Sequence, residues 1–327
     1  METRKFVVVG HVDHGKSTLC GNLLYKCGAV GEHEMEKIRE EAKKDGMESW
    51  SWARILDIYE EEKARGKTME YTVFPFSTYK NNKEIKWEMI DTPGHKSLIR
   101  SMITGINNYD ASSVIGCLVI SLSRGEFESG WLNGQTKEDC ILLRASGIEN
   151  LIVIFNKMDK INWDRNIYEK YSSQISAFIK PLNFSSVVFM PLSSLNGIGI
   201  ISTLEMPTWY NGKSLLDILS DVKIKCKINE NNVCYKTAKF IVRLKILNCP
   251  QLISTGFSCI MHHSTNETDV IFSKLTPSYI TPKTQNIITA IISSPPINIF
   301  KSQRVIFRTC TSTIGFGIVD KILPFPH

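Results

Sequence analysis

The sequence predicts an α/β domain with a mainly parallel β-sheet, followed by one small antiparallel β-barrel or sandwich domain. Strands and helices alternate along residues 5–221, which is typical of a parallel sheet with helices on both faces. After residue 235 the chain consists of short β-rich runs separated by turn residues. We therefore expect domains at 1–222 and 235–327, joined by a polar linker at 223–234.

The composition is that of a globular protein without a membrane segment. The chain has 327 residues, of which 43% are hydrophobic and 22% charged. No apolar stretch approaches the roughly 20 residues that cross a bilayer, and the first strand follows Met1 so closely that no targeting segment is expected. The nine cysteines are odd in number and contain no Cys-x-x-Cys pair. This argues against a disulfide framework or a zinc site and favours the cytoplasm. The net charge of +6 permits contact with RNA without requiring it.

Residues 10–18 (GHVDHGKST) match the phosphate-binding loop pattern, Gly-x4-Gly-Lys-Ser. An apolar run at 6–9 precedes the motif, and a helix is expected at 16–27, which is the context that such a loop requires. Backbone N–H groups at the helix start can surround a phosphate chain, and Lys16 brings a positive charge to its outer phosphates. The Ser17 hydroxyl is the expected magnesium ligand. The predicted phosphate-binding residues are Val12, Asp13, His14, Gly15, Lys16, Ser17 and Thr18.

The next segment, 33–64, mixes charged residues with apolar residues at helical spacing, which predicts two exposed helices. It lies where P-loop GTPases carry their first switch. Thr68 follows it and precedes a strand expected at 69–76, so we predict that Thr68 is a second hydroxyl ligand for magnesium.

A strand expected at 85–90 ends in residues 91–95 (DTPGH). Asp91 can hold magnesium through water, and the Gly94 N–H can contact a γ-phosphate. His95 would then lie near the attacking water, and we predict it as the catalytic residue. The alternative is a histidine that is satisfied by local hydrogen bonds.

Apolar strands at 113–121 and 151–155 flank a helix expected at 135–146, and the second strand leads into residues 156–159 (NKMD). The Asp159 carboxylate can accept the ring N–H and the exocyclic amine of guanine, a donor pair that adenine lacks. Lys157 can lay its stem along the base, and Asn156 can tie this loop to the phosphate loop. A last strand at 187–190 and a helix at 214–221, capped by Ser214, complete the domain. After that strand, three residues are expected to close over the guanine carbonyl: Ser193, Ser194 and Leu195.

The C-terminal region carries no catalytic constellation. Its strands are expected at 238–247, 257–262, 270–275, 286–292, 305–307 and 314–322. The neighbours His262 and His263 could be taken for a metal site. Adjacent strand residues point to opposite faces, so surface or core histidines are expected instead.

Together the motifs at 10–13, 91–95 and 156–159 resemble those of the translational GTPases of the elongation factor 1-alpha group. The likeness covers most of residues 1–221. Within this group the chain is most similar to the eukaryotic class II peptide-release-factor GTPase. The segments that carry this likeness are 66–70 (GKTME), 91–97 (DTPGHKS), 123–130 (SRGEFESG) and 134–136 (GQT). The ribosome-rescue GTPase that partners Pelota is a close second.

This resemblance implies a switch that binds GTP and GDP with Mg²⁺ and hydrolyses GTP, slowly without a ribosome or partner, with His95 positioning the water. It implies that Asp13 holds a monovalent cation, as in some members. The implied partners are the ribosome and a class I release-factor-like or Pelota-like protein that docks on the C-terminal barrel. Arg304 and Arg308 correspond to arginines of that barrel and are expected either to contact the partner or to form structural salt bridges. Gln303 and Thr309 depart from the family pattern.

Members of the group carry two barrels after the GTPase domain, whereas the roughly 105 residues after Val222 leave room for one. The likeness of residues 235–322 to the last barrel implies that the middle barrel is missing. Because the middle barrel helps to hold the aminoacyl end of tRNA, tRNA delivery is not expected. A rival hypothesis is a non-hydrolysing module that holds GTP structurally or sequesters a release-factor-like partner.

Overall fold

The computed structural model describes residues 2–44, 51–64, 72–91, 113–132, 135–224, 234–247, 252–263, 266–280, 287–309 and 312–323. The chain divides into two compact units, one built around a mixed sheet and the other around a barrel. Each unit is described by itself below.

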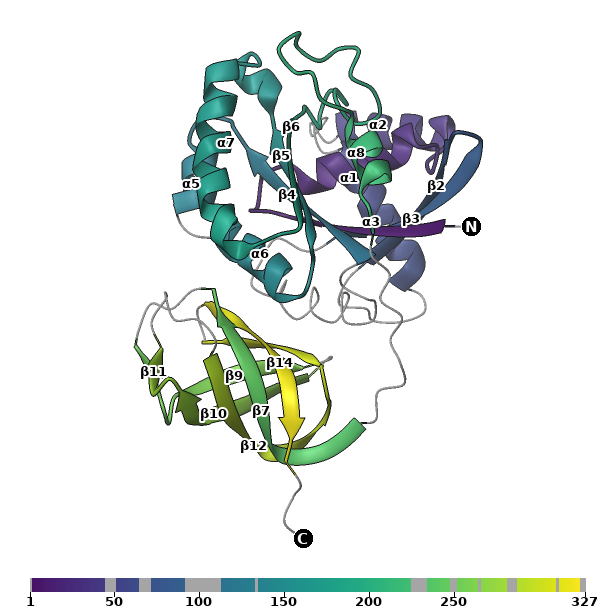
Figure 1. Ribbon diagram of the computed structural model, residues 1–327. Coiled ribbons are helices and arrows are strands. Elements are labelled where there is room, and N and C mark those ends of the chain that lie inside the picture. The colour runs from purple at the N-terminus through teal and green to yellow at the C-terminus, as the bar shows by residue number, and fades with distance from the viewer. Residues whose placement is uncertain are drawn as a thin grey trace. The chain divides into compact units, whose positions relative to one another are not determined.

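The first unit is built on a six-stranded sheet in the order β2-β3-β1-β4-β5-β6 (Figure 1). β2 runs antiparallel to β3 and every other pair is parallel, so the prediction of a mainly parallel sheet is confirmed. Every residue of the central strands β4 and β5 is buried, as expected for strands covered on both faces. The strands are β1 (Glu2–Val9), β2 (Thr72–Lys80), β3 (Lys83–Asp91), β4 (Val114–Ser121), β5 (Asn150–Asn156) and β6 (Ser186–Pro191).

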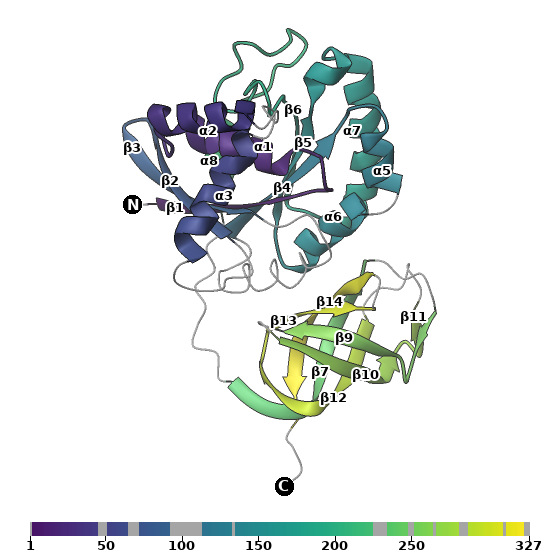
Figure 2. The same ribbon diagram turned by 180° about the vertical axis from the view of Figure 1, so that it is seen from behind.

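Helices cover both faces of this sheet (Figures 1 and 2). One face carries α1 (Lys16–Lys26), α2 (Glu32–Lys44), α3 (Ser51–Ala64) and α8 (Leu215–Asp221), whose apolar residues share one core with alternate residues of the strands. The opposite face carries α5 (Glu126–Leu132), α6 (Gln135–Ala145) and α7 (Arg165–Ile179). Two short 3₁₀ helices, η3 (Met158–Ile161) and η4 (Lys180–Leu182), flank α7. None of the helices in the described part of the chain is long and apolar enough to span a bilayer.

The helices predicted at 16–27, 135–146 and 214–221 are confirmed, and the Ser214 hydroxyl accepts a hydrogen bond from the Asp217 N–H as the N-cap of α8. The two helices predicted within 33–64 are present, but the prediction that they are exposed is wrong. Met35 and Ile38 of α2, with Trp52 and Ile55 of α3, are buried in the core beside α1. The charged residues of α2 are exposed on the other faces of this amphipathic helix.

Two α-helices in the described part of this unit, α5 and α7, were not predicted. The side chain of Asp164 caps α7 by accepting from the N–H groups of Asn166 and Ile167. The buried residues of α7, Ile175 and Ile179, are four positions apart, which is the spacing of residues on one face of a helix.

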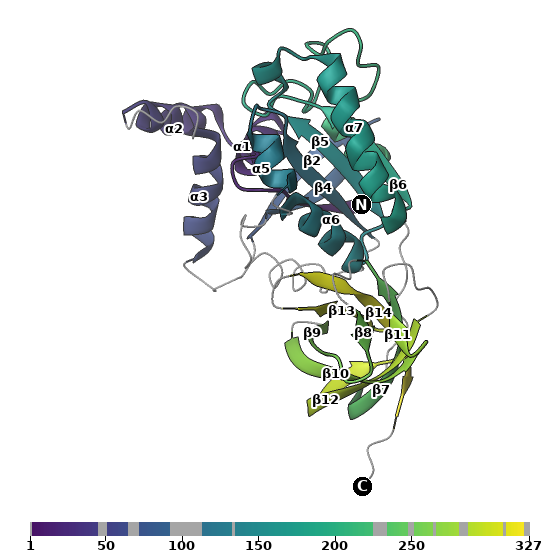
Figure 3. The same ribbon diagram turned by 90° about the vertical axis from the view of Figure 1, so that its left-hand side faces the viewer.

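The second unit is a closed antiparallel barrel in the order β10-β12-β7-β14-β13-β9, which confirms the predicted barrel over the sandwich (Figure 3). Pairing of β9 with β10 closes it, and alternate residues such as Phe240, Val242 and Phe272 fill its core. Its strands are β7 (Cys234–Ile246), β9 (Ser258–His263), β10 (Asn266–Thr276), β12 (Ile287–Phe300), β13 (Arg304–Arg308) and β14 (Thr313–Ile322), with a separate pair β8 (Ile253–Ser254) and β11 (Tyr279–Ile280). The described residues between 234 and 323 contain one barrel and this separate strand pair.

Candidate functional site

The loops after β1, β5 and β6, which carry predicted site residues, leave the sheet at its carboxyl edge, and β3 ends at the same edge with Asp91. In the parallel pairs, Val9 is level with Leu118, Ser121 with Asn156, and Phe155 with Pro191. The strand ends therefore lie side by side, and the loops that follow them meet above the same edge. This is where open α/β sheets bind ligands.

The loop between β1 and α1 has a backbone that requires glycine at two positions. Gly10 has φ +147° and a Cβ there would lie 2.3 Å from the Val119 carbonyl oxygen. Gly15 has φ +86° and a Cβ there would lie 2.4 Å from Asn156 Nδ2. Asp13 also adopts the left-handed conformation, with φ 66°. The loop is thus packed closely against β4 and the last residue of β5.

The loop delivers the chain to a helix start that is suited to an anion. α1 begins at Lys16 with Gly15 as its N-cap, so no side chain caps its free N–H groups, and no acidic residue lies in its first turn. An uncapped helix N-terminus attracts negative charge through these N–H groups and the helix dipole.

Lys16 places a cation at this helix start. Its side chain is 7% exposed, and its ammonium donates to the His11 carbonyl oxygen across the loop at 3.0 Å. Burial lowers the pKa of Lys16, and the nearby carboxylates of Asp91 and Asp139 act in the opposite direction. A buried ammonium that faces a carbonyl oxygen gains strongly from an anionic ligand.

His14, inside the same loop, is a packed residue. Its ring is 1% exposed, with Nδ1 3.2 Å from the Val119 carbonyl oxygen and Nε2 3.2 Å from the Glu126 carbonyl oxygen. Burial lowers the pKa of His14 to about 4, so the ring is neutral at pH 7. His14 contributes to the site through its backbone and through its packing.

Asn156 connects three loops. The sequence predicted its contact with the phosphate loop, and the contact with the loop after β6 is additional. Its amide donates to the His14 carbonyl oxygen at 2.8 Å, and its Oδ1 accepts from the Ser194 N–H at 2.9 Å. The Ser194 carbonyl oxygen in turn accepts from Asn22 Nδ2 at 2.7 Å. All of these groups are buried. The phosphate loop, the end of β5 and the loop after β6 are therefore connected by hydrogen bonds within the protein itself.

Lys157 and Asp159 follow Asn156 at the end of β5. Lys157 adopts the left-handed conformation at φ 59°, and its ammonium pairs with Glu126 Oε2 at 2.7 Å. Asp159 lies in the 3₁₀ turn η3 and is partly exposed, so its carboxylate remains accessible to a donor pair such as that of guanine.

Two of the residues predicted around magnesium lie close to the phosphate loop. Ser17 is in the first turn of α1, and Asp91 ends β3 level with Val8 of β1. A hydroxyl and a carboxylate are oxygen donors of the kind that Mg²⁺ prefers, so these residues fit such an ion. The other predicted residues, Thr68, Gly94 and His95, lie outside the described residues.

The remaining predicted residues differ in accessibility. Val12 and Thr18 are partly exposed, Ser193 and Ser194 are buried, and Leu195 is 40% exposed. The Ser193 hydroxyl accepts from the Asn196 N–H at 3.4 Å, which shapes the loop after β6.

Two contacting residues were missed by the sequence analysis. Asn22 is a buried polar residue on a helix face that otherwise presents Leu19 and Leu23, and this interruption was the available sign. Glu126 stands in the segment 123–130, which was used for the resemblance without a role in the site.

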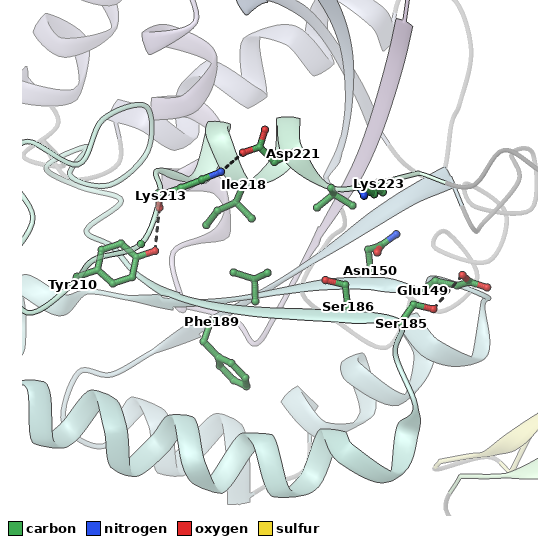
Figure 4. Close-up of a pocket in the computed structure, with 13 residues that line it drawn as sticks. Glu149, Asn150, Ser185, Ser186, Phe189, Tyr210, Lys213, Ile218, Asp221 and Lys223 are labelled. Atoms are coloured by element: carbon green, nitrogen blue, oxygen red, sulfur yellow. Dashed lines mark hydrogen bonds and ion pairs between the residues drawn. The ribbon is translucent and has the colours of Figure 1, made fainter.

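Two surface hollows lie apart from these motifs. One, of about 590 Å³, is lined by Asn150 and Ser186 at the amino ends of β5 and β6 and by Tyr210 and Lys213, at the edge opposite the motif loops (Figure 4). The other, of about 570 Å³, lies between the loop after β4 and the start of α7. Neither is lined by any predicted site residue, so the site is defined by the loop contacts and not by these hollows.

In the barrel, both predicted arginines are partly buried, and the Arg304 guanidinium lies 3.9 Å from the centre of the Phe316 ring. The two residues that depart from the family pattern make local hydrogen bonds within turns. Gln303 Oε1 accepts from the Phe300 N–H, and Thr309 exchanges hydrogen bonds with Ser312. His262 and His263 are both buried; His262 faces Glu267 at 3.5 Å, and His263 contacts the Thr268 hydroxyl at 3.0 Å.

Comparisons with known proteins agree with this architecture. The family described as "Elongation factor Tu GTP binding domain" matches residues 1–223. Elongation factor 1-alpha of Aeropyrum pernix is 40% identical over 226 residues, which cover 68% of this chain and 50% of that protein. The chain spans about half the length of the first curated relatives that it matches.

Other relatives match nearly the whole chain. The eukaryotic peptide chain release factor GTP-binding subunit of Schizosaccharomyces pombe is 29% identical over 428 residues, covering 97% of this chain and 63% of that protein. That alignment is about 100 positions longer than this chain, so the release factor carries segments without a counterpart here. The S. cerevisiae Ski7 GTPase-like domain, solved with GDP and inorganic phosphate, shares the fold with a TM-score of 0.79 at 16% identity, over 97% of each chain.

Proposed function

Because this chain belongs to the elongation factor Tu GTP-binding domain family, we propose that it binds guanine nucleotides and hydrolyses GTP to GDP and phosphate. The observation that carries the proposal is the pair of hydrogen bonds made by Asn156. They hold the phosphate loop at His14 and the loop at Ser194 together with the NKMD segment. A site with this much preformed structure loses less entropy when a ligand binds.

Each part of the nucleotide has a proposed partner. The phosphates meet the free N–H groups of α1 and the ammonium of Lys16. The guanine edge is read by the Asp159 carboxylate, and the base lies along the stem of Lys157. Bound magnesium supplies charge neutralisation at the phosphates, with Ser17, Thr68 and Asp91 as the residues that would hold it, Asp91 through water.

For hydrolysis we propose that His95 orients the attacking water while Lys16 stabilises charge on the transferred phosphoryl group. The test is single-turnover hydrolysis of GTP with and without ribosomes, for the wild type and for His95→Ala. We expect the variant to bind GTP normally and to lose the stimulated hydrolysis. Stimulated hydrolysis at the wild-type rate in His95→Ala would refute the assigned role. Absence of any hydrolysis by the wild type would favour the non-hydrolysing module.

We propose further that the protein acts in the cytoplasm as a translation factor of the release-factor type, on the ribosome and with a class I release-factor-like partner. The near-complete coverage of this chain by the S. pombe release factor subunit supports this role. The alternative is a rescue factor with a Pelota-like partner. Delivery of tRNA is disfavoured by the single barrel in the described residues.

The partner proposal is tested by binding of the purified chain, loaded with a non-hydrolysable GTP analogue, to immobilised class I release factor and to immobilised Pelota protein. We expect retention on the release factor that depends on GTP. Retention on Pelota alone would establish the alternative, and retention on neither would refute both.

A further inference from the structure

The first residue of α5, Glu126, contacts both nucleotide loops of the proposed site. Its carboxylate Oε2 lies 2.7 Å from the Lys157 ammonium, in the loop after β5. Its backbone carbonyl oxygen lies 3.2 Å from Nε2 of His14, in the phosphate loop. One residue thus joins two loops that lie more than a hundred positions apart in the sequence.

The contact with His14 is closely packed. A Cβ on Gly130, one turn further along α5, would lie 2.5 Å from His14 Cε1, so only glycine fits there. The other ring nitrogen of His14 faces the Val119 carbonyl oxygen at 3.2 Å. The His14 ring therefore packs between β4 and α5, and through it α5 is in direct contact with the phosphate loop.

The contact with Lys157 fixes a flexible side chain. The two side chains are about one-third exposed, and Glu126 is further held by the Ser121 hydroxyl. Burial acts to raise the pKa of Glu126, but the hydrogen bonds from Lys157 and Ser121 outweigh it and the pKa is lowered. The carboxylate is therefore ionised at neutral pH and holds the ammonium in one position through an ion pair.

We propose that Glu126 is a positioning residue for guanine nucleotides: it orders the side chain of Lys157, whose stem then forms a ready surface for the base. This rests on the proposed nucleotide-binding function. A lysine that is already ordered loses less conformational entropy when the base packs against it. Because the effect acts on the base and not on the γ-phosphate, it favours GTP and GDP equally.

The test is the dissociation constant for GTP and for GDP, measured by calorimetry for the wild type, Glu126→Gln, Lys157→Gln and the double variant. Glu126→Gln keeps the shape of the side chain and removes its charge. We expect it to weaken binding of both nucleotides by about two- to five-fold, the upper part of the range for loss of a partly exposed ion pair. We expect no further loss when it is added to Lys157→Gln, because the residue acts through that lysine.

Glu128→Gln is the matched control, because Glu128 lies on the same helix and its carboxylate accepts from the Tyr171 hydroxyl of α7 at 3.0 Å instead of pairing with Lys157. It should bind both nucleotides as the wild type does. Wild-type affinity in Glu126→Gln would overturn the inference, as would an equal loss in the Lys157→Gln background. A wild type that binds neither nucleotide would instead overturn the proposed function.

Discussion

Replacing Asn156 with alanine tests the connection between the three loops. The side chain is 1% exposed and makes two short hydrogen bonds, from its amide to the His14 carbonyl oxygen at 2.8 Å and to its Oδ1 from the Ser194 N–H at 2.9 Å. Alanine removes both partners and leaves the two backbone groups buried.

The expected cost follows from those two groups. An unsatisfied buried backbone group costs about 1–3 kcal/mol, so leaving two of them in Asn156→Ala should lower the free energy of unfolding by about 2–6 kcal/mol. If the loops of the variant move so that these backbone groups reach water, the loss of stability is smaller. Nucleotide binding is then weaker, because the ligand must bring the loops back into contact.

The assay is urea unfolding without nucleotide, followed by tryptophan fluorescence. All six tryptophans precede residue 222, so the emission reports on the first unit alone. Asn166→Ala is the control, because Asn166 is exposed at the start of α7, and it should change the free energy of unfolding by less than about 0.5 kcal/mol. Equal stability of the two variants would refute the bracing role of Asn156.

Two further predictions concern His14 and Asp159. The pKa of His14 is lowered from 6.5 to about 4, so between those values the unfolded chain binds a proton that the folded chain excludes. The free energy of unfolding should therefore fall by about 3 kcal/mol as the pH decreases through this window, and His14→Gln should remove that dependence. Urea titrations at several pH values measure the free energy of unfolding. The same pH dependence in His14→Gln as in the wild type would contradict this prediction. Asp159→Asn should shift binding from guanosine to xanthosine nucleotides, because an amide presents a donor where the carboxylate accepts; unchanged selectivity in competition binding would exclude this base pocket.

The candidate site could be located from the sequence because the motifs for phosphate and guanine recognition are short contiguous segments that follow predicted strands. The motif 10–18 and the Asn156 contact with the phosphate loop could be inferred in this way, and the barrel could be inferred from its short β-rich runs. The sheet order and the second connection of Asn156, to Ser194, became clear from the structure.

Contacts between distant segments could not be predicted. Glu126 and Lys157 are 31 positions apart, and Asn22 and Ser194 are 172 apart, with no local pattern that pairs them. The exposure of α2 and α3 was misjudged because charged residues dominate their composition, although one face of each is buried. The helix α7 was missed even though its capping residue and its apolar spacing were readable.

The most direct test of the central claim is calorimetry on the intact chain in magnesium buffer with GTP, GDP and ATP in turn. The account predicts saturable binding of GTP and of GDP at one site, and no binding of ATP. Failure to detect heat with either guanine nucleotide, for a protein whose tryptophan emission shows it to be folded, would contradict the account.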